Sequence, residues 1–216
     1  MTSARSRSGE KRAGRADGEH SPAMKQLFRC KEQHPDALVF FRMGDFYELF
    51  FEDAIVAGRA LDIAVTSRAK APDGTDIPMA GVPHFAATTY LARLLEQGFK
   101  VAICEQMADP RTVKGLVPRE VVRVVSPGLI LEPDALAAGE DNLLVAIAAA
   151  AGRVGIAALE LSRAELRVCS VPSEMAALSE VLRLGPREVL FVGARIEGLA
   201  RALERALRHV RYEVVP

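Results

Sequence analysis

Aromatic rings and carboxylates are concentrated in one short segment of the chain, residues 40–51. The segment reads Phe-Phe-Arg-Met-Gly-Asp-Phe-Tyr-Glu-Leu-Phe-Phe, so six of its twelve residues are aromatic, against 6% of the whole sequence. Aromatic side chains either pack into a core or stack on another planar group. We therefore expect this segment to supply core packing, a stacking surface, or both.

Phe46 and Glu48 follow the pair Gly44-Asp45, where we expect the chain to turn a corner. Successive side chains of an extended backbone point to opposite sides, so residues two apart should project from the same side. Tyr47, which lies between them, should face the other way and pack inward. A ring and a carboxylate would then share the tip of the corner.

This pair has chemistry suited to probing how easily DNA deforms. Pushing an apolar ring between base steps costs a few kcal/mol, and base–ring stacking returns about 1–3 kcal/mol, so the two nearly cancel on a perfect duplex. A mismatch has already lost stacking and pairing, so deformation is cheaper there. Phosphates repel a carboxylate from intact duplex, but Glu48 can hydrogen-bond the exposed edge of a displaced base, after taking up a proton where needed.

A simpler interpretation of the same residues stays open. The segment would then be a strand-to-helix corner with an aromatic core, and Glu48 would be a solvated surface acid. The four phenylalanines at the two ends of the segment favour this core role. Residue types alone leave both interpretations open for Phe46 and Glu48.

The distribution of charge limits how the chain can hold DNA. Residues 1–20 carry 5 basic and 3 acidic side chains, residues 21–136 carry 13 and 15, and residues 137–216 carry 10 and 10. A protein that held DNA by neutralising phosphates alone should be basic. Any DNA binding must therefore depend on other contacts or on other parts of a larger protein, and we expect weak binding by this chain alone.

Neither membrane insertion nor a disulfide framework is indicated. The longest apolar run, Leu143 to Ala151, is shorter than the roughly 20 residues of a membrane-spanning helix. Residues 1–20 lack the apolar stretch of a signal peptide, so we expect a cytoplasmic protein. Cys30, Cys104 and Cys169 are odd in number and widely spaced, which argues against disulfides and Cys-x-x-Cys metal sites. They should be small buried residues.

We predict a disordered tail over residues 1–20, followed by a mixed α+β domain over residues 21–136. In this domain Ser21-Pro22 is a typical helix start, and His34-Pro35 should end that helix. Hydrophobic periodicity predicts the remaining elements. Helices are expected near residues 50–61 and 83–97, and strands at 37–43, 63–66, 77–82, 100–104 and 120–125.

A second domain is predicted over residues 137–216, after a linker rich in turn residues at 127–139. Three apolar stretches at hairpin spacing indicate three antiparallel strands. A helix, a buried strand and a second helix follow, which is the opening of a ribonuclease-H-like α/β layout. The last strand is expected to be barely begun at the end of the chain, so the layout is expected to be truncated. The predicted strands are 143–149, 154–161, 164–171, 188–192 and 210–215, with helices beginning near residues 172 and 196.

Four sequence blocks resemble one known family. They are Ser-Pro-Ala-Met-Lys-Gln at residues 21–26, Phe-Phe-Arg-Met-Gly-Asp-Phe-Tyr-Glu-Leu-Phe at 40–50, Ile-Pro-Met-Ala-Gly-Val-Pro-His at 77–84 and Val-Ala-Ile-Cys-Glu-Gln at 101–106. The same blocks occur in the same order in the MutS family of DNA mismatch-repair proteins. The similarity covers about residues 21–216 and implies the mismatch-recognition domain followed by most of the connector domain.

The resemblance also implies roles for individual residues. The family's Phe-x-Glu motif falls on Phe46 and Glu48, so Phe46 would stack on the mispaired base and Glu48 would hydrogen-bond to it. Met43 and Asp45 would line the same wedge, and Arg68 would meet the DNA backbone. The implied partner is double-stranded DNA containing mismatches or small loops.

Full-length members of the family dimerise and hydrolyse ATP with magnesium through a carboxy-terminal domain. This sequence contains no Gly-x-x-x-x-Gly-Lys-Ser/Thr loop and no Gly-Lys pair, so we expect neither enzyme activity nor a cofactor in this chain. Homodimer contacts are expected only in carboxy-terminal domains that are missing here. The connector is expected to offer a docking surface for a repair-protein partner, and the protein to associate with the nucleoid.

Two other functions remain as alternatives. A ribonuclease-H-like domain can carry a two-metal nuclease, and Glu160 is the one carboxylate along the first two hairpin strands, while Asp45, Glu48, Glu52 and Asp53 form a possible acidic cluster. The second alternative is a protein-interaction module that does not bind DNA.

Overall fold

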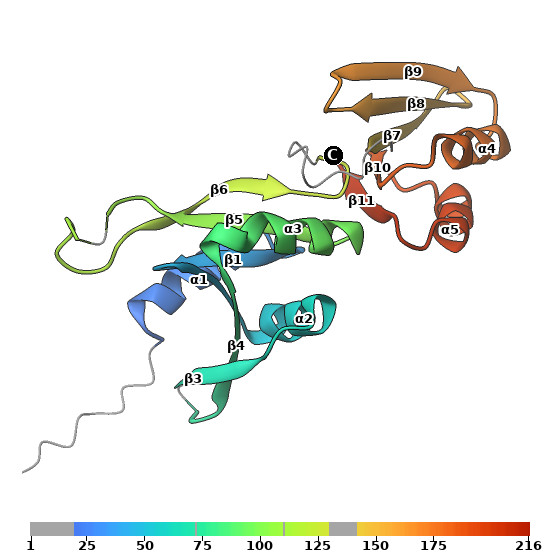
Figure 1. Cartoon of the computed structure of the whole chain (residues 1–216). Coiled ribbons are helices and arrows are strands. Elements are labelled where there is room, and N and C mark those ends of the chain that lie inside the picture. Colours follow the sequence, from blue (N-terminus) through green and yellow to red (C-terminus); the bar gives the residue numbers. More distant parts are fainter. Residues whose placement is uncertain (1–19, 72, 110, 130–141) are drawn as a thin grey trace, which may run out of the picture.

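The computed structural model describes residues 20–71, 73–109, 111–129 and 142–216. These residues form two mixed β-sheets, each flanked by helices (Figure 1). The predicted α/β fold class is therefore confirmed. The expected tail lies outside the described residues except for His20, and so does most of the expected linker at 127–139.

The first sheet has six strands in the order β3-β4-β2-β1-β5-β6. Strand β1 pairs in parallel with β5, and the other neighbouring strands run antiparallel. The strands are β1 (Ala37–Met43), β2 (Phe46–Phe50), β3 (Thr66–Lys70), β4 (Asp76–Pro83), β5 (Lys100–Gln106) and β6 (Arg119–Val125).

Helices cover both faces of this sheet. Helix α1 (Pro22–Gln33) packs Leu27 and Cys30 onto one face, while α2 (Phe51–Leu61) and α3 (Ala87–Glu96) pack onto the other. Because β1 is buried on both sides, its sequence is an almost continuous apolar run. Phe40 and Phe41 are 0% and 1% exposed, as expected for the core part of the aromatic segment.

The predicted start and end of α1 are confirmed, but the helix expected to open at Pro83 begins later, because Pro83 is the last residue of β4. The Ser21 hydroxyl accepts a hydrogen bond from the Met24 amide at 3.3 Å, and Pro22 is the first helical residue. Helix α3 follows a short 3-10 turn, η1 (His84–Ala86). It ends before Gly98, whose positive φ of 85° is favourable for glycine.

Two predictions in this sheet are wrong. The turn expected at Gly44-Asp45 is present, but residues 46–50, where no strand was expected, form a regular strand, β2, so the chain does not pass directly from β1 into α2. The strand expected at 63–66 begins at Thr66, because Asp62 ends α2 with a left-handed φ of 56° and Ile63 still donates to the Gly58 carbonyl at 3.1 Å. Pairing with β4 starts once the chain has left the helix.

The second sheet has five strands in the order β11-β10-β7-β8-β9. Its first three strands form the predicted antiparallel meander, and β10 and β11 add in parallel beside β7, as in a ribonuclease-H-like layout. Helices α4 (Glu174–Leu184) and α5 (Glu197–Ala206) cover one face. The strands are β7 (Leu143–Ala150), β8 (Arg153–Glu160), β9 (Glu165–Val171), β10 (Glu188–Val192) and β11 (Arg211–Val215).

Strand β11 confirms the strand expected at residues 210–215. Arg211 to Val215 pair in register with all five residues of β10, so this last strand is fully paired rather than barely begun. Its partner residues lie 23 positions earlier in the chain, so the pairing depends on a tertiary contact that periodicity does not reveal.

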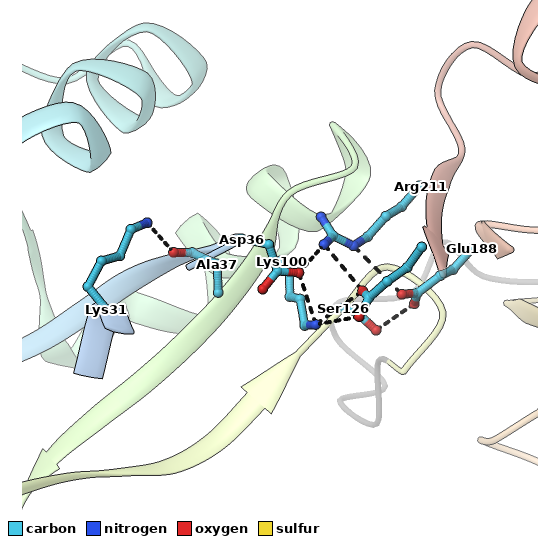
Figure 2. Close-up of polar contacts among 8 residues, drawn as sticks. Lys31, Asp36, Ala37, Lys100, Ser126, Glu188 and Arg211 are labelled. Atoms are coloured by element: carbon cyan, nitrogen blue, oxygen red, sulfur yellow. Dashed lines mark hydrogen bonds and ion pairs between the residues drawn. The ribbon is translucent and has the colours of Figure 1, made fainter. Parts of the chain in front are cut away.

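A cluster of charged side chains joins the two sheets (Figure 2). The Arg211 guanidinium donates to Asp36 at 2.5 Å, and Lys100 donates to both Asp36 and Glu213, at 3.1 Å in each case. On the other side of Arg211, the buried Glu188 carboxylate accepts from the Ser126 hydroxyl at 2.5 Å. The cluster connects β5 and the end of β6 with β10 and β11, and thereby holds the two sheets together.

No helix within the described ranges is both long enough and apolar enough to cross a membrane. The prediction of buried cysteines is confirmed for Cys30 and Cys104 but is wrong for Cys169, which is exposed. Cys169 lies on β9, an edge strand with few covered side chains.

Candidate nucleic-acid interface

Phe46 and Glu48 lie on a tight hairpin. Strands β1 and β2 pair with Met43 opposite Phe46, which leaves Gly44 and Asp45 as a two-residue loop. Gly44 has a φ of 61°, and glycine is the residue preferred at the first position of such loops. The Asp45 carbonyl accepts a hydrogen bond from the His84 amide at 2.8 Å, so the loop is tied to the end of β4.

The ring of Phe46 and the carboxylate of Glu48 share one face of the sheet, as the alternation of side chains predicted. Gly81 on β4 pairs with Glu48. A Cβ atom at Gly81 would lie 3.7 Å from Cδ1 of Phe46 and 3.9 Å from Cγ of Glu48. The absence of a side chain there leaves room for both groups. Phe46 is 46% exposed.

Tyr47 faces the opposite side and is 5% exposed, which confirms that it packs inward. Its ring lies 5.6 Å from the Phe40 ring and 5.4 Å from the His84 ring, measured between centroids. Its hydroxyl donates to the Glu105 carboxylate on β5. Burial, followed by this contact with Glu105, raises the pKa of Tyr47. The tyrosine thus anchors β2 to the core.

Arg119 is a member of this site that sequence analysis missed. Its Nε atom donates to the Arg42 carbonyl at 2.7 Å, and its Nη2 atom lies 3.4 Å from the Met43 sulfur. Its guanidinium lies 5.1 Å from the centre of the Phe41 ring. Burial lowers the pKa of Arg119, while the negative charge of Glu48 acts to raise it. Nothing in the local pattern links Arg119 to a hairpin 76 residues earlier.

The other residues predicted to contact DNA do not all lie beside Phe46 and Glu48. Met43 is the last residue of β1 and is partly buried, and Asp45 is exposed in the loop. Arg68 lies on β3, which is separated from β2 by β4. Only the backbone position of Arg68 belongs to the described part of the chain.

Phe85 is a second exposed ring near the hairpin. It lies in η1, directly after the His84 amide that binds the loop, and it is 91% exposed. Sequence analysis placed it at a helix start without a role. The polar and alanine residues around Phe85 in the sequence gave no signal that would distinguish an exposed ring from a buried one.

The carboxylates that suggested a metal site do not form one. Asp53 is buried, where it accepts from the Lys31 ammonium at 2.7 Å and from the Val39 amide at 3.0 Å. Glu160 accepts from the Ser162 hydroxyl at 2.8 Å and from the Arg163 amide at 2.7 Å. Within the residues that the structure describes, no group of three or more His, Cys, Asp or Glu side chains could hold a metal ion.

The hairpin thus presents a half-exposed ring beside a carboxylate, and an exposed aromatic ring can stack on a planar group. A family model described as MutS domain I matches residues 21–134, which is more than half of the chain. The chain therefore belongs to the MutS domain I family.

Individual relatives agree with this assignment. The chain is 49% identical over 182 residues to the DNA mismatch repair protein MutS of Desulfatibacillum aliphaticivorans, and this alignment covers 84% of the chain and 20% of the relative. It is 51% identical over 170 residues to the protein of the same name from Desulfosudis oleivorans, covering 79% and 19%. For that of Anaeromyxobacter dehalogenans the values are 47% over 188 residues, covering 85% and 21%. The chain thus spans about a fifth of the length of these relatives.

Proposed function

We propose that this chain recognises mispaired DNA in mismatch repair, with Phe46 stacking on the mispaired base and Glu48 hydrogen-bonding to it. The main observation in support of this proposal is the solvent exposure of Phe46. The other rings of β1 and β2 are at most 9% exposed, whereas Phe46 is 46% exposed. A large apolar side chain held at the end of a rigid hairpin loses little conformational freedom on stacking.

The surroundings of Glu48 support its part in the proposal. A carboxylate approaching DNA is repelled by phosphates, and the positive charge of Arg119 beside it weakens that repulsion. Arg119 also holds the backbone at Arg42 and the side chain of Met43. We assign Met43 and the exposed Asp45 to the edges of the wedge, and Arg68 to a contact with the DNA backbone.

The wider organisation is proposed on the same basis. Residues 21–136 form the mismatch-recognition domain and residues 137–216 form part of a connector that docks a repair-protein partner. Homodimerisation and ATP hydrolysis belong to regions of the longer relatives that this chain does not match. The chain then acts by binding rather than by catalysis, in the cytoplasm and at the nucleoid.

A binding experiment tests the role of Phe46. Fluorescence anisotropy at low salt compares a duplex carrying one G·T mismatch or a one-base loop with the matched duplex. Low salt is used because phosphate contacts weaken steeply as salt rises. We expect tighter binding to the defective duplexes, and we expect Phe46→Ala to abolish that difference. Met175→Ala on α4 removes another exposed side chain and should leave the difference unchanged.

Because a short chain with balanced charge binds weakly, a chimera gives the sharper measurement. Residues 21–216 replace the matching segment of the Desulfatibacillum aliphaticivorans relative, with and without Phe46→Ala. Loss of mismatch preference on that substitution is the expected result. Equal affinities for mismatched and matched DNA, indifferent to Phe46, would instead favour a protein-interaction module.

A further inference from the structure

Two of the three cysteines meet in the core of the first sheet. Cys30 on α1 and Cys104 on β5 are 74 residues apart in sequence, yet their sulfur atoms lie 3.4 Å apart. They are 4% and 0% exposed. The third cysteine, Cys169, lies on β9 of the other sheet and is exposed.

The two thiols share one hydrogen bond. This bond lowers the pKa of Cys30 to about 7, burial opposes the shift, and the positive charge of Arg29 adds to it. The pKa of Cys104 is raised, first by its contact with Cys30 and then by burial. Thiolates, not thiols, are the nucleophiles of cysteine chemistry. Cys30 lines a pocket, whereas Cys104 is 0% exposed, so we expect Cys30 to react first and Cys104 second.

A pocket gives small oxidants access to Cys30. It has a volume of about 410 Å³ and is lined by Cys30 together with Gln26, Arg29, Gln33 and Arg119, among others. Arg29, Arg119 and Glu120 are among the residues that line the pocket with Cys30, so the pocket is polar and large enough for a hydroperoxide.

We propose that Cys30 and Cys104 form a redox pair that closes to an intrachain disulfide when a hydroperoxide enters this pocket. The Cys30 thiolate attacks the terminal peroxide oxygen and the O–O bond breaks. The departing alkoxide takes a proton and leaves as an alcohol, or as water when the oxidant is hydrogen peroxide. The Cys104 sulfur then attacks the resulting sulfenic acid, the S–O bond breaks, and the Cys104 proton leaves with that oxygen as water. Two thiols are oxidised and one peroxide is reduced.

The disulfide would tie α1 to β5 behind the recognition hairpin. Cys104 pairs with Phe41 on β1, and Phe41 pairs with Glu48 on β2. Closing a loop of this length restricts the unfolded chain strongly, so the oxidised protein should be the more stable form. This proposal does not depend on the proposed binding of DNA.

The test uses the 216-residue chain with Cys169→Ser, which removes the exposed thiol and prevents links between molecules. The folded protein is treated with hydrogen peroxide, and separately with diamide, and free thiols are then alkylated. Trypsin cleavage after Arg29, Lys31, Lys100 and Arg111 isolates the two cysteines on separate peptides. We expect these peptides to be joined, with a mass about 2 Da below their sum. The midpoint of thermal unfolding should rise by about 10 °C and return on reduction.

Single variants serve as matched controls. Cys30→Ala and Cys104→Ala, each in the Cys169→Ser background, should lose both the joined peptide and the rise in midpoint. Unfolding the protein in urea before oxidation should slow formation of the joined peptide, because the sulfurs are then no longer held together. If the folded protein keeps two alkylatable thiols, or if Cys30 oxidises only to acids without joining Cys104, the redox pair is refuted.

Discussion

Glu188 holds the two sheets together from the inside of the charged cluster. Its side chain is 3% exposed and accepts hydrogen bonds from the Ser126 hydroxyl at 2.5 Å and the Gly128 amide at 3.0 Å. Its other oxygen lies 3.8 Å from Nε of Arg211. Replacing Glu188 with alanine removes the acceptor for both donors and leaves Arg211 with fewer partners.

The size of the effect follows from these contacts. A hydrogen bond to a charged group contributes about 1.5–3 kcal/mol, and breaking a buried ion pair by removing one partner costs about 3–5 kcal/mol. Arg211 keeps Asp36 and Glu213 as partners, so the lower end of the range applies. We expect Glu188→Ala to reduce the free energy of unfolding by about 3 kcal/mol. Glu188→Gln keeps an acceptor for the two donors but loses the charge, so it should cost about 1 kcal/mol, the difference between a charged and a neutral hydrogen bond.

Equilibrium unfolding in urea, followed by circular dichroism at pH 7, measures this loss. Glu165→Ala is the matched control, because Glu165 is an exposed glutamate whose contact with Arg167 is 2.7 Å long. Exposed ion pairs contribute little, so this variant should change the free energy by less than about 0.5 kcal/mol. If Glu188→Ala costs no more than Glu165→Ala, the cluster does not stabilise the contact between the sheets, and the reasoning fails.

Three further predictions concern other parts of the chain. Burial alone would raise the pKa of Asp36, but the hydrogen bond and charge of Lys100 and the charge of Arg211 lower it below its ordinary value of 3.8. A carboxylate with a lowered folded-state pKa stabilises the protein above its unfolded-state pKa, and this stabilisation is lost as the pH falls through the folded-state pKa. Asp36→Asn should therefore lower the urea midpoint at pH 7, and the difference from wild type should shrink as the pH falls below 3.8. Parallel curves down to about pH 2 would contradict this. Gly58→Ala should gain about 1 kcal/mol of helix propensity but lose more stability than that, because its Cβ would lie 2.3 Å from Cγ2 of Val65. Gly198→Ala should be neutral or stabilising in urea unfolding, because its Cβ meets the flexible end of Glu174 at 2.7 Å. Equal effects of the two substitutions would show that the contact with Val65 is unimportant. Arg119→Lys keeps the positive charge near Glu48 but loses the guanidinium that donates to the Arg42 carbonyl. Under the proposed function, it should reduce mismatch preference in the anisotropy assay with little change in the midpoint of thermal unfolding. Unchanged preference would show that Arg119 does not position the hairpin.

The predictions that succeeded depend on short-range physics. Ser21 and Pro22 start α1 because a side-chain cap and a fixed φ act within one turn. The apolar run of β1 reflects burial on both faces. The side on which Phe46 and Glu48 project followed from the alternation of extended backbone, even though the strand β2 itself was not predicted.

The errors fall where distant pairing decides the outcome. Thr66 rather than Ile63 begins β3, because pairing must wait for the end of α2. Arg119 joins the hairpin only because β6 neighbours β5 and β5 neighbours β1.

The sequence by itself determined the α/β class, the family, and the aromatic and acidic residues available for recognition. These properties are local or compositional, and they are encoded in motifs of a few residues. The tertiary structure alone decided which rings stay exposed, which arginine stands beside Glu48, and which cysteines meet. The physical reason is that exposure and contact depend on strand order and sheet coverage, which bring together residues more than 70 positions apart.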